Sequence, residues 1–261
     1  MITGDHRDTA VAIANELGIL DGVDEAGNAV TYEAITGAEL EELSDEYFME
    51  HVGDYSVYAR VQPEHKVRIV NAWKRKDKVT AMTGDGVNDA PSIKSADIGV
   101  GMGITGTDVT KNVADMILTD DNFATIVAAV AEGRRIYDNI RKAIQFLLSS
   151  NLAEVIAIFI ATIMNFTILK PAHLLWINLI TDCFPAIGLG MEETEADTMI
   201  QPPRNKADGI FSGGLGTEVV VQGFVIAILT VVSYAVGHYL ENGNWHIETS
   251  PDGMTMAFLT L

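Results

Sequence analysis

Cysteine and basic side chains are scarce in this chain of 261 residues. Its single cysteine, Cys183, excludes an intramolecular disulfide framework. The chain has 17 lysine and arginine residues against 36 aspartate and glutamate residues, which leaves a formal net charge of −19. Nucleic-acid binding needs a basic footprint, so no nucleic-acid partner is expected. Hydrophobic residues make up 48% of the chain, and this content excludes an intrinsically disordered protein.

Acidic and apolar residues are concentrated in different parts of the chain. Residues 1–142 contain 14 basic and 25 acidic side chains, whereas residues 143–261 contain 3 and 11 within long apolar runs. A chain of this length forms one or two domains. We therefore expect a soluble domain over residues 1–133 and a membrane domain over residues 134–261.

Short β-like runs alternate with helical patterns in the first part of the chain. This alternation indicates an α/β domain with a parallel sheet. Glycine and basic residues mark where the helical patterns stop. The pattern predicts helices over 9–17, 63–74 and 122–139, strands over 55–61, 78–82 and 98–100, and a polar turn over 21–28.

Two groups of polar residues are expected at the surface of this domain. The acidic run over residues 39–42 is typical of a solvated helix face. Three histidines do not cluster with other metal-type ligands, and we expect them to be exposed. They are His6, His51 and His65.

Three long apolar runs in the second part have the length of membrane-spanning helices, which need about 20 apolar residues. They cover about 143–169, 171–191 and 216–240, and a short apolar stretch near the end is the start of a fourth. Glu154 is the only charged residue of the first run, and Asp182 is the only charged residue of the second. A buried helical hairpin of a soluble protein is the alternative for these two runs. Three such runs favour an integral, multi-pass membrane protein with the lipid bilayer as its partner.

Basic residues near the ends of these runs predict their orientation. The segment after the third run has no lysine or arginine. The positive-inside rule therefore places the α/β domain and the loop 192–214 in the cytoplasm. The residues that carry this argument are Arg134, Arg135, Arg141 and Lys142 before the first run, and Arg204 and Lys206 after the second.

A glycine-rich acidic run, TGDGVNDAP, occupies residues 83–91 at the end of an expected strand. Open α/β sheets bind ligands at the carboxyl ends of their strands. Asp85 is free to face a hard cation such as Mg²⁺ there. Asn88 can hydrogen-bond a phosphate, and Asp89 can orient the loop or a water molecule. The alternative is a simple acidic turn.

The start of the chain supplies a related group. Thr3, Gly4 and Asp5 directly precede a helix, so a hydroxyl and backbone N–H groups can hold phosphate oxygens. Lys66, near the start of another helix, offers a point charge to the same phosphate. The alternatives are an ordinary helix N-cap for the first group and a solvated side chain for Lys66.

These three segments together resemble the phosphorylation domain of P-type cation-transporting ATPases, and the resemblance continues in order through the chain. It implies a haloacid-dehalogenase-like (Rossmannoid) α/β fold, here a partial cytoplasmic phosphorylation domain, followed by an α-helical transmembrane region. The resemblance assigns Asp85 to Mg²⁺, and Thr3 and Lys66 to the phosphoryl group. It assigns the surrounding hydrogen-bond network to Asp5, Asn88 and Asp89.

One departure from the family concerns the nucleophile. The family uses the aspartate of an Asp-Lys-Thr-Gly-Thr motif, which this chain lacks, as it lacks a Thr-Gly-Glu-Ser loop. A nucleotide-binding insert would precede Thr3, so Met1 is expected to be an internal methionine. The expected partners are the actuator and nucleotide-binding domains and the first four membrane helices of a longer pump. The chain alone is not expected to hydrolyse ATP, because an aspartyl-phosphate needs the missing carboxylate.

Polar residues within the first two apolar runs form a set of oxygen ligands suited to a hard cation. Asn151 and Glu154 share one helix face, and Asn178, Thr181 and Asp182 share another. Ionisable residues in a bilayer mark functional sites. Interhelical hydrogen bonding is the alternative role. We also expect Pro185 and the following glycines to interrupt the second helix and free backbone carbonyls for an ion.

These polar blocks resemble the fifth and sixth membrane helices of calcium pumps, especially the sarco/endoplasmic reticulum type. The resemblance implies ATP hydrolysis with Mg²⁺, coupled to transport of Ca²⁺ at two sites. Five side chains fall short of the six to eight oxygens that Ca²⁺ takes. Two alternatives remain: a non-catalytic membrane fragment that regulates a full-length pump, and a pump for Na⁺, H⁺ or Mn²⁺.

Overall fold

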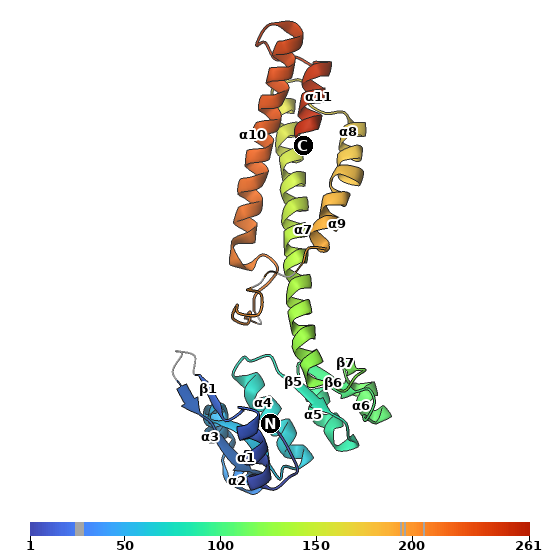
Figure 1. Cartoon of the computed structure of the whole chain (residues 1–261). Coiled ribbons are helices and arrows are strands. Elements are labelled where there is room, and N and C mark those ends of the chain that lie inside the picture. Colours follow the sequence, from blue (N-terminus) through green and yellow to red (C-terminus); the bar gives the residue numbers. More distant parts are fainter. Residues whose placement is uncertain (24–28, 194, 196, 206) are drawn as a thin grey trace. The chain divides into compact units, whose positions relative to one another are not determined.

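The computed structural model describes residues 1–23, 29–193, 195, 197–205 and 207–261. Residues 24–28 of the expected turn and the basic residue Lys206 lie outside this description. Internal contacts divide the chain into two compact units, Met1–Ile126 and Val127–Leu261, which are described separately (Figure 1).

The first unit is an α/β domain with two groups of parallel strands. β3 (Glu33–Thr36) pairs with β4 (Tyr55–Ala59), and β5 (Ala81–Gly84), β6 (Ile98–Met102) and β7 (Met116–Leu118) form a second parallel sheet in that order. An antiparallel hairpin of β1 (Asp21–Val23) and β2 (Ala29–Thr31) precedes them. The expected parallel α/β arrangement is therefore confirmed, although the hairpin, β3 and β7 were not anticipated.

Helices connect the parallel strands of this unit. α4 (Pro63–Arg75) joins β4 to β5, with proline in its first turn and basic residues in its last, as the sequence predicts. α1 (Arg7–Glu16) begins slightly before the expected range, and its N-cap is His6. The short helices are α2 (Gly37–Glu42), α3 (Asp45–His51), α5 (Ala90–Ser95) and α6 (Asp108–Val113), with 3₁₀ turns at Val52–Asp54 and Val87–Asp89.

The expectation that all three histidines lie at the surface is wrong for His65. Only 6% of His65 is exposed. Its Nδ1 accepts a hydrogen bond from the Gln62 N–H at 3.1 Å, and its Nε2 lies 2.9 Å from Glu41 Oε1. His65 thus provides the hydrogen-bond acceptor for a backbone N–H group at the N-terminus of α4. A search for metal ligands does not reveal this requirement of the backbone.

α4 packs against both groups of strands. Its residues Ile69 and Ala72 pack with β4, whereas Val70 packs with Met82 of β5 and Ile93 of α5. Ile2 forms a parallel bridge with Tyr58 of β4 and also packs against the cluster around Val70. Among the described residues β4 therefore pairs with β3 and Ile2, while β5 pairs only with β6.

The second unit is helical. α7 (Phe123–Ile163) is a single helix of 41 residues, which merges the expected helix 122–139 with most of the first apolar run. It ends before Asn165, whose positive φ of 61° breaks the helical hydrogen bonding. α8 (Pro171–Trp176), a π-helical turn at Ile177–Thr181 and α9 (Cys183–Gly190) follow. Then come a 3₁₀ turn at Ser212–Gly214, α10 (Leu215–Asn242) and α11 (Pro251–Thr260).

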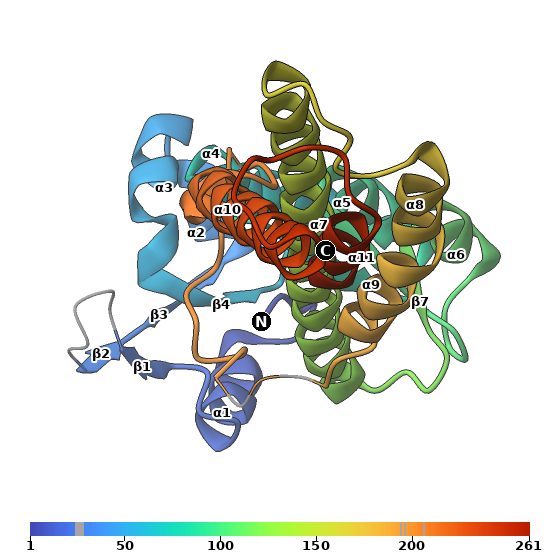
Figure 2. The same cartoon turned by 90° about the horizontal axis from the view of Figure 1, so that it is seen from above.

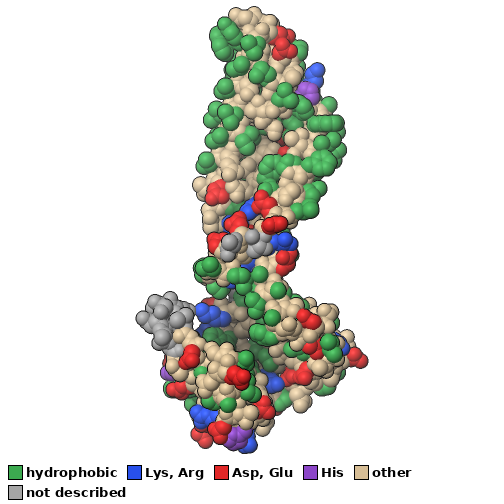
Figure 3. Space-filling view, viewed as in Figure 1, with side chains coloured by type: hydrophobic (Ala, Val, Ile, Leu, Met, Phe, Trp, Pro, Cys, Tyr) green, Lys and Arg blue, Asp and Glu red, His purple; other side chains and the backbone are tan. Residues whose placement is uncertain are grey.

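Three of these helical stretches are long and apolar enough to cross a membrane: Phe123–Ile163, Pro171–Gly190 and Ser212–Asn242. Figure 3 shows hydrophobic side chains exposed along the visible face of the helical unit. Phe159, Leu179 and Phe184 are each more than 60% exposed. Apolar exposure on this scale is typical of a surface that meets lipid or other helices.

Small residues let the helices of this unit approach one another closely. Ala157 and Ala161 of α7 belong to one buried cluster with Tyr234 of α10 and Ala257 of α11. α11 lies beside α10 in both views (Figures 1 and 2). A Cβ atom on Gly237 would lie 2.7 Å from the Asp252 carbonyl oxygen, so this crossing requires glycine.

Candidate functional sites

The loop after β5 places Asp85 at the carboxyl end of a parallel strand. Its side chain is exposed, while its backbone carbonyl accepts hydrogen bonds from the Thr107 N–H at 2.9 Å and the Thr110 hydroxyl at 3.5 Å. The carboxylate is therefore held at the ligand-binding edge of the sheet and left free to face solvent. The sequence analysis did not identify Thr107 or Thr110, which come from a different strand–helix connection.

Lys66 and Asp89 form a partly buried ion pair in the same loop region. Lys66 Nζ donates to Asp89 Oδ1 at 2.5 Å, and the Gly86 N–H donates to the other carboxylate oxygen at 3.3 Å. The lysine and aspartate side chains are 19% and 10% exposed. A Cβ atom on Gly84 would lie 2.4 Å from the Asp89 Cβ, so glycine is required where β5 ends. Asn88 is exposed beside this pair.

Thr3 and Asp5 form a small turn at the start of the chain. The Thr3 hydroxyl donates to Asp5 Oδ2 at 2.8 Å, and the Asp5 N–H donates to Thr3 Oγ1 at 3.1 Å. Because His6 is the N-cap of α1, these residues are not its cap. Gly4 is exposed and has no steric need for glycine. No hydrogen bond within the described part of the chain joins this turn to the Lys66–Asp89 pair.

Two buried carboxylates lie in the second unit. Glu154 of α7 is 6% exposed, and both of its oxygens accept hydrogen bonds from Asn178 Nδ2, at 3.2 and 3.0 Å. Asp182 is 1% exposed and accepts from the Ser150 hydroxyl at 3.1 and 3.2 Å. The structure thus brings α7 and the segment around the π-helical turn together through two neutral donors.

Asn151 and Thr181 lie outside these two pairs. Asn151 is exposed, and its Nδ2 donates to the Leu147 carbonyl of its own helix at 2.7 Å. Thr181 is also exposed. The residue that the sequence analysis missed is Ser150, which is four residues before Glu154 and shares its helix face more closely than Asn151 does.

The interruption of the second membrane stretch is a π-helical turn before Pro185 rather than a break at it. The Asp182 N–H donates to the Ile177 carbonyl at 2.9 Å, which is an i to i−5 bond. Pro185 has no N–H to donate to the Thr181 carbonyl, so regular α-helical bonding cannot continue there. π-Helical turns inside α-helices occur frequently at functional sites.

The basic residues at the start of this unit bind the loop 192–214. Arg134 Nη1 donates to the carbonyls of Thr198 and Gln201 at 2.8 and 2.9 Å, and Arg141 Nη2 donates to the Ser212 carbonyl at 2.7 Å. Lys142 pairs with Glu192 and Glu195 at 2.7 and 2.8 Å. These contacts lie within the Val127–Leu261 unit.

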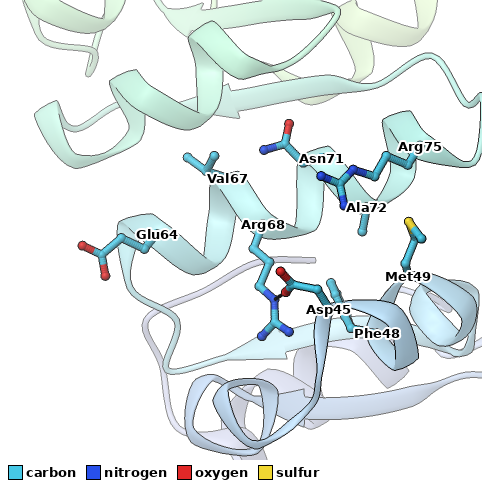
Figure 4. A pocket seen from close by; sticks show the side chains of 9 residues that line it. All are labelled: Asp45, Phe48, Met49, Glu64, Val67, Arg68, Asn71, Ala72 and Arg75. Atoms are coloured by element: carbon cyan, nitrogen blue, oxygen red, sulfur yellow. Dashed lines mark hydrogen bonds and ion pairs between the residues drawn. The ribbon is translucent and has the colours of Figure 1, made fainter.

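A cavity of about 280 Å³ between α3 and α4 contains none of the candidate residues. Figure 4 shows Arg68 reaching from α4 towards Asp45 and Phe48 at its centre. Arg68 also donates to the carbonyls of Leu40 and Leu43, so its role is to join α4 to the α2–α3 segment. The described residues contain no group of three or more His, Cys, Asp or Glu side chains arranged to hold a metal ion.

Comparison with known proteins defines the class of both units. Residues 1–97 match the family described as haloacid dehalogenase-like hydrolase, and residues 166–261 match the family described as cation transporting ATPase, C-terminus. The chain therefore has a haloacid dehalogenase-like hydrolase domain followed by the C-terminal region of cation-transporting ATPases. The fold expected from its motifs is confirmed.

Full-length relatives make the similarity more specific. The chain is 48% identical over its whole length to calcium-transporting ATPase 1 of Bacillus cereus (strain ATCC 10987 / NRS 248), of which it spans 30%. It is 48% identical to calcium-transporting ATPase 1 of Lactococcus lactis and 45% identical to the calcium-transporting ATPase of Bacillus subtilis, and it spans 28% of each. The resemblance to P-type cation-transporting ATPases is thus confirmed, and the chain covers less than a third of these relatives. They are bacterial, and their names do not specify the sarco/endoplasmic reticulum type.

Proposed function

We propose that this chain is the C-terminal part of an ATP-driven P-type Ca²⁺ transporter, whose aspartyl-phosphate forms on a residue outside the chain. The observation that carries the proposal is the pair of buried carboxylates, Glu154 and Asp182, on two apolar helices. Buried charge without a cationic partner is costly, and in a membrane it marks a functional site. Similarity to calcium-transporting ATPases over the whole chain supports Ca²⁺ as the cation.

The soluble unit is proposed to serve phosphoryl transfer. Asp85 fits a Mg²⁺ ion, because its exposed carboxylate stands at the carboxyl end of β5 and its backbone carbonyl is held by the Thr107 N–H. When bound, Mg²⁺ would neutralise charge on phosphoryl oxygens. Lys66 has three N–H donors and uses one on Asp89, which leaves two for the phosphoryl group.

The remaining proposed residues surround this site. The Gly4 backbone N–H and the exposed Asn88 side chain are proposed to hydrogen-bond phosphoryl oxygens. The Thr3 hydroxyl is proposed to join them by turning its single hydrogen from Asp5 Oδ2 to the phosphoryl group, while the Asp5 N–H keeps its bond to Thr3 Oγ1. Asp89 fixes the lysine rather than the phosphate, because its own oxygens already accept from Lys66 and Gly86.

The unpaired strand edges of the soluble unit indicate where the nucleophile from outside the chain would lie. Ile2 and β5 each leave one edge unpaired among the described residues, and both pack with Val70 of α4. Unpaired edges are templates for another strand. We propose that a parallel strand from the N-terminal part of the pump inserts between them. Its carboxyl end would then present the nucleophilic aspartate between Thr3 and Asp85.

The membrane unit is proposed to hold part of the Ca²⁺ site. Glu154 and Asp182 provide buried oxygens, while Asn151, Asn178 and Thr181 are exposed and can contribute oxygens to a cation that is also bound by helices outside the chain. Ca²⁺ takes six to eight oxygens, so further ligands are needed. More specifically, we propose that the complete transporter has two Ca²⁺ sites, as in pumps of the sarco/endoplasmic reticulum type.

The proposed location is a multi-pass membrane with the soluble unit and loop 192–214 in the cytoplasm. The basic residues of α7 support this orientation through the positive-inside rule. ATP, the N-terminal pump domains and the first four membrane helices are the proposed partners of the complete transporter.

A chimaeric pump tests the proposal. The chain replaces the matching segment of the Bacillus cereus relative, and Ca²⁺-dependent phosphorylation by ATP is measured in membranes. Asp182→Asn is expected to raise the Ca²⁺ concentration for half-maximal phosphorylation at least about 10-fold, a loss of about 1.4 kcal/mol. The control is Glu218→Gln, the same acid-to-amide change at an exposed position of α10, which is expected to have no effect.

Two results would contradict the proposal. Unchanged Ca²⁺ dependence in Asp182→Asn would remove this residue from the cation site. Stimulation of phosphorylation by Na⁺, Mn²⁺ or protons but not by Ca²⁺ would replace the transported ion.

A further inference from the structure

Asp121 is the centre of a dense hydrogen-bond network between β7 and α7. Its two carboxylate oxygens accept four hydrogen bonds: from the N–H groups of Gly103, Ile104 and Thr105, at 2.6, 3.0 and 2.7 Å, and from the Thr105 hydroxyl at 2.7 Å. Three consecutive N–H groups directed at one anion form a backbone nest. Asp121 has a positive φ of 49°, a conformation that aspartate tolerates better than most residues.

The network keeps Asp121 ionised. The Ile104 N–H, together with Thr105 and Gly103, outweighs the opposing effect of desolvation and lowers the pKa of Asp121 to about 2. At neutral pH the carboxylate is therefore ionised and accepts hydrogen bonds from residues 103–105 of the loop over residues 103–107.

The same loop leads directly to Asp85. The Thr107 N–H donates to the Asp85 carbonyl at 2.9 Å, and Thr107 is also the N-cap of α6. The loop has little freedom to shift, because a Cβ atom on Gly106 would lie 2.1 Å from the Met102 carbonyl oxygen. A continuous path of contacts thus runs from Asp121 through residues 103–107 to the backbone of Asp85.

The neighbouring Asp120 has a separate task. Its carboxylate accepts from the Asn122 N–H at 3.1 Å and from the Thr125 hydroxyl at 2.6 Å, so it caps the beginning of α7. Asp121 is therefore not needed as the helix cap. Among the described residues, the hydrogen bonds of its carboxylate all come from residues 103–105 of the loop.

We infer that Asp121 is a positioning residue for Asp85, which it holds in place through the loop 103–107. The inference rests on the proposed role of Asp85 as the Mg²⁺ ligand. Groups that orient a metal ligand from outside the coordination sphere typically change metal affinity by about 10-fold or more when they are replaced.

Hydrogen exchange on the full chain in detergent, without Mg²⁺, supplies the first measurement. Asp121→Asn removes the charge and one acceptor oxygen, and it is expected to speed exchange of the amides of residues 103–105 and of Thr107 about 10-fold. Asp120→Asn is the matched control. It is expected to leave these amides unchanged and to speed exchange only at the start of α7.

The second measurement is the Mg²⁺ dependence of phosphorylation in the chimaeric pump. Asp121→Asn is expected to raise the Mg²⁺ concentration for half-maximal phosphorylation about 10-fold, and Asp120→Asn is expected to leave it unchanged. Asp85→Asn is expected to raise it without altering exchange of the amides of residues 103–105.

The outcomes separate the inference from the function on which it rests. If Asp85→Asn raises the Mg²⁺ requirement and Asp121→Asn does not, the role of Asp121 is overturned and Asp85 keeps its own. If Asp85→Asn leaves the Mg²⁺ requirement unchanged, the proposed Mg²⁺ ligand is wrong and the inference fails with it. An unchanged rate of amide hydrogen exchange at Thr107 in Asp121→Asn would show that Asp121 does not hold the backbone next to Asp85 in place, and would overturn the inference.

Discussion

The two units bury carboxylates in different ways. In the soluble unit Asp89 meets the ammonium of Lys66, so negative and positive charge lie together. In the helical unit the carboxyl groups of Glu154 and Asp182 receive hydrogen bonds, among the described residues, from a neutral amide and a neutral hydroxyl. The first arrangement is a completed ion pair that fixes a loop. The second joins two buried carboxyl groups to neutral donors, with no cationic partner among the described residues, which suits a site that takes up a cation.

The largest expected effect comes from breaking the completed pair. Lys66→Met leaves Asp89 buried without its cation and is expected to destabilise the fold by about 3–5 kcal/mol. Urea unfolding of the chain in detergent measures the change. Lys94→Met, at an exposed position of α5, is the control and should cost little. A loss below 1 kcal/mol for Lys66→Met, by the same reasoning, would mean that the pair is effectively solvated.

A smaller effect is expected from crowding the same pair. Gly84→Ala would place a Cβ atom 2.4 Å from the Asp89 Cβ and is expected to cost about 1–3 kcal/mol. Gly86→Ala is the matched control, since its nearest contact would be an ordinary 3.7 Å. Equal unfolding free energies for the two variants would contradict the close packing of β5 on Asp89.

The helical unit should respond in the opposite direction. Asp182→Asn replaces a buried carboxyl group that has no cationic partner among the described residues by a neutral amide of similar size, so in the absence of Ca²⁺ it is expected to leave the stability of the chain unchanged or raise it by about 1 kcal/mol. Asp89→Asn in the soluble unit should instead lower stability, because it leaves Lys66 unpaired. Thermal unfolding of both variants in Ca²⁺-free detergent compares them directly. Destabilisation of similar size in both would remove the distinction between the two kinds of burial.

The smallest effect concerns pH. The pKa of Asp121 is lowered from 3.8 to about 2, first by the Ile104 N–H, so the ionised form stabilises the folded loop above pH 3.8. This stabilisation is lost as the pH falls through 2. The difference in urea midpoint between the wild-type chain and Asp121→Asn should therefore be constant at neutral pH and disappear between about pH 4 and pH 2. A difference that persists at pH 2 would rule out the carboxylate charge as its source.

Local patterns made much of the soluble unit predictable. The alternation of strand and helix around α4 follows from hydrophobic periodicity, and the tight turn at Asp85 follows from the glycines on either side of it; a sequence displays both directly. The burial of His65 was not predictable, because it depends on the unsatisfied N-terminus of α4 and on Glu41 from a separate helix.

The candidate cation site was predictable in composition but not in detail. Charged residues within apolar runs identified Glu154 and Asp182. Ser150, not Asn151, contacts the second helical stretch. Which of these two adjacent residues faces that stretch depends on how α7 is rotated about its axis, and residue spacing alone does not determine this rotation. The roles assigned to these residues in ion transport stay predictions.

The π-helical turn at Ile177–Thr181 is equivalent to one residue inserted into an α-helix. Its presence sets the angular register between the residues before it and those after it. Deleting a single residue from the turn would restore α-helical winding and rotate the downstream segment by about 100° relative to the upstream one. Asn178 could then keep its bond to Glu154 while Asp182 turned away from Ser150. The two contacts of this segment with α7, through Asn178 and Asp182, thus depend on the length of the segment as much as on its side chains.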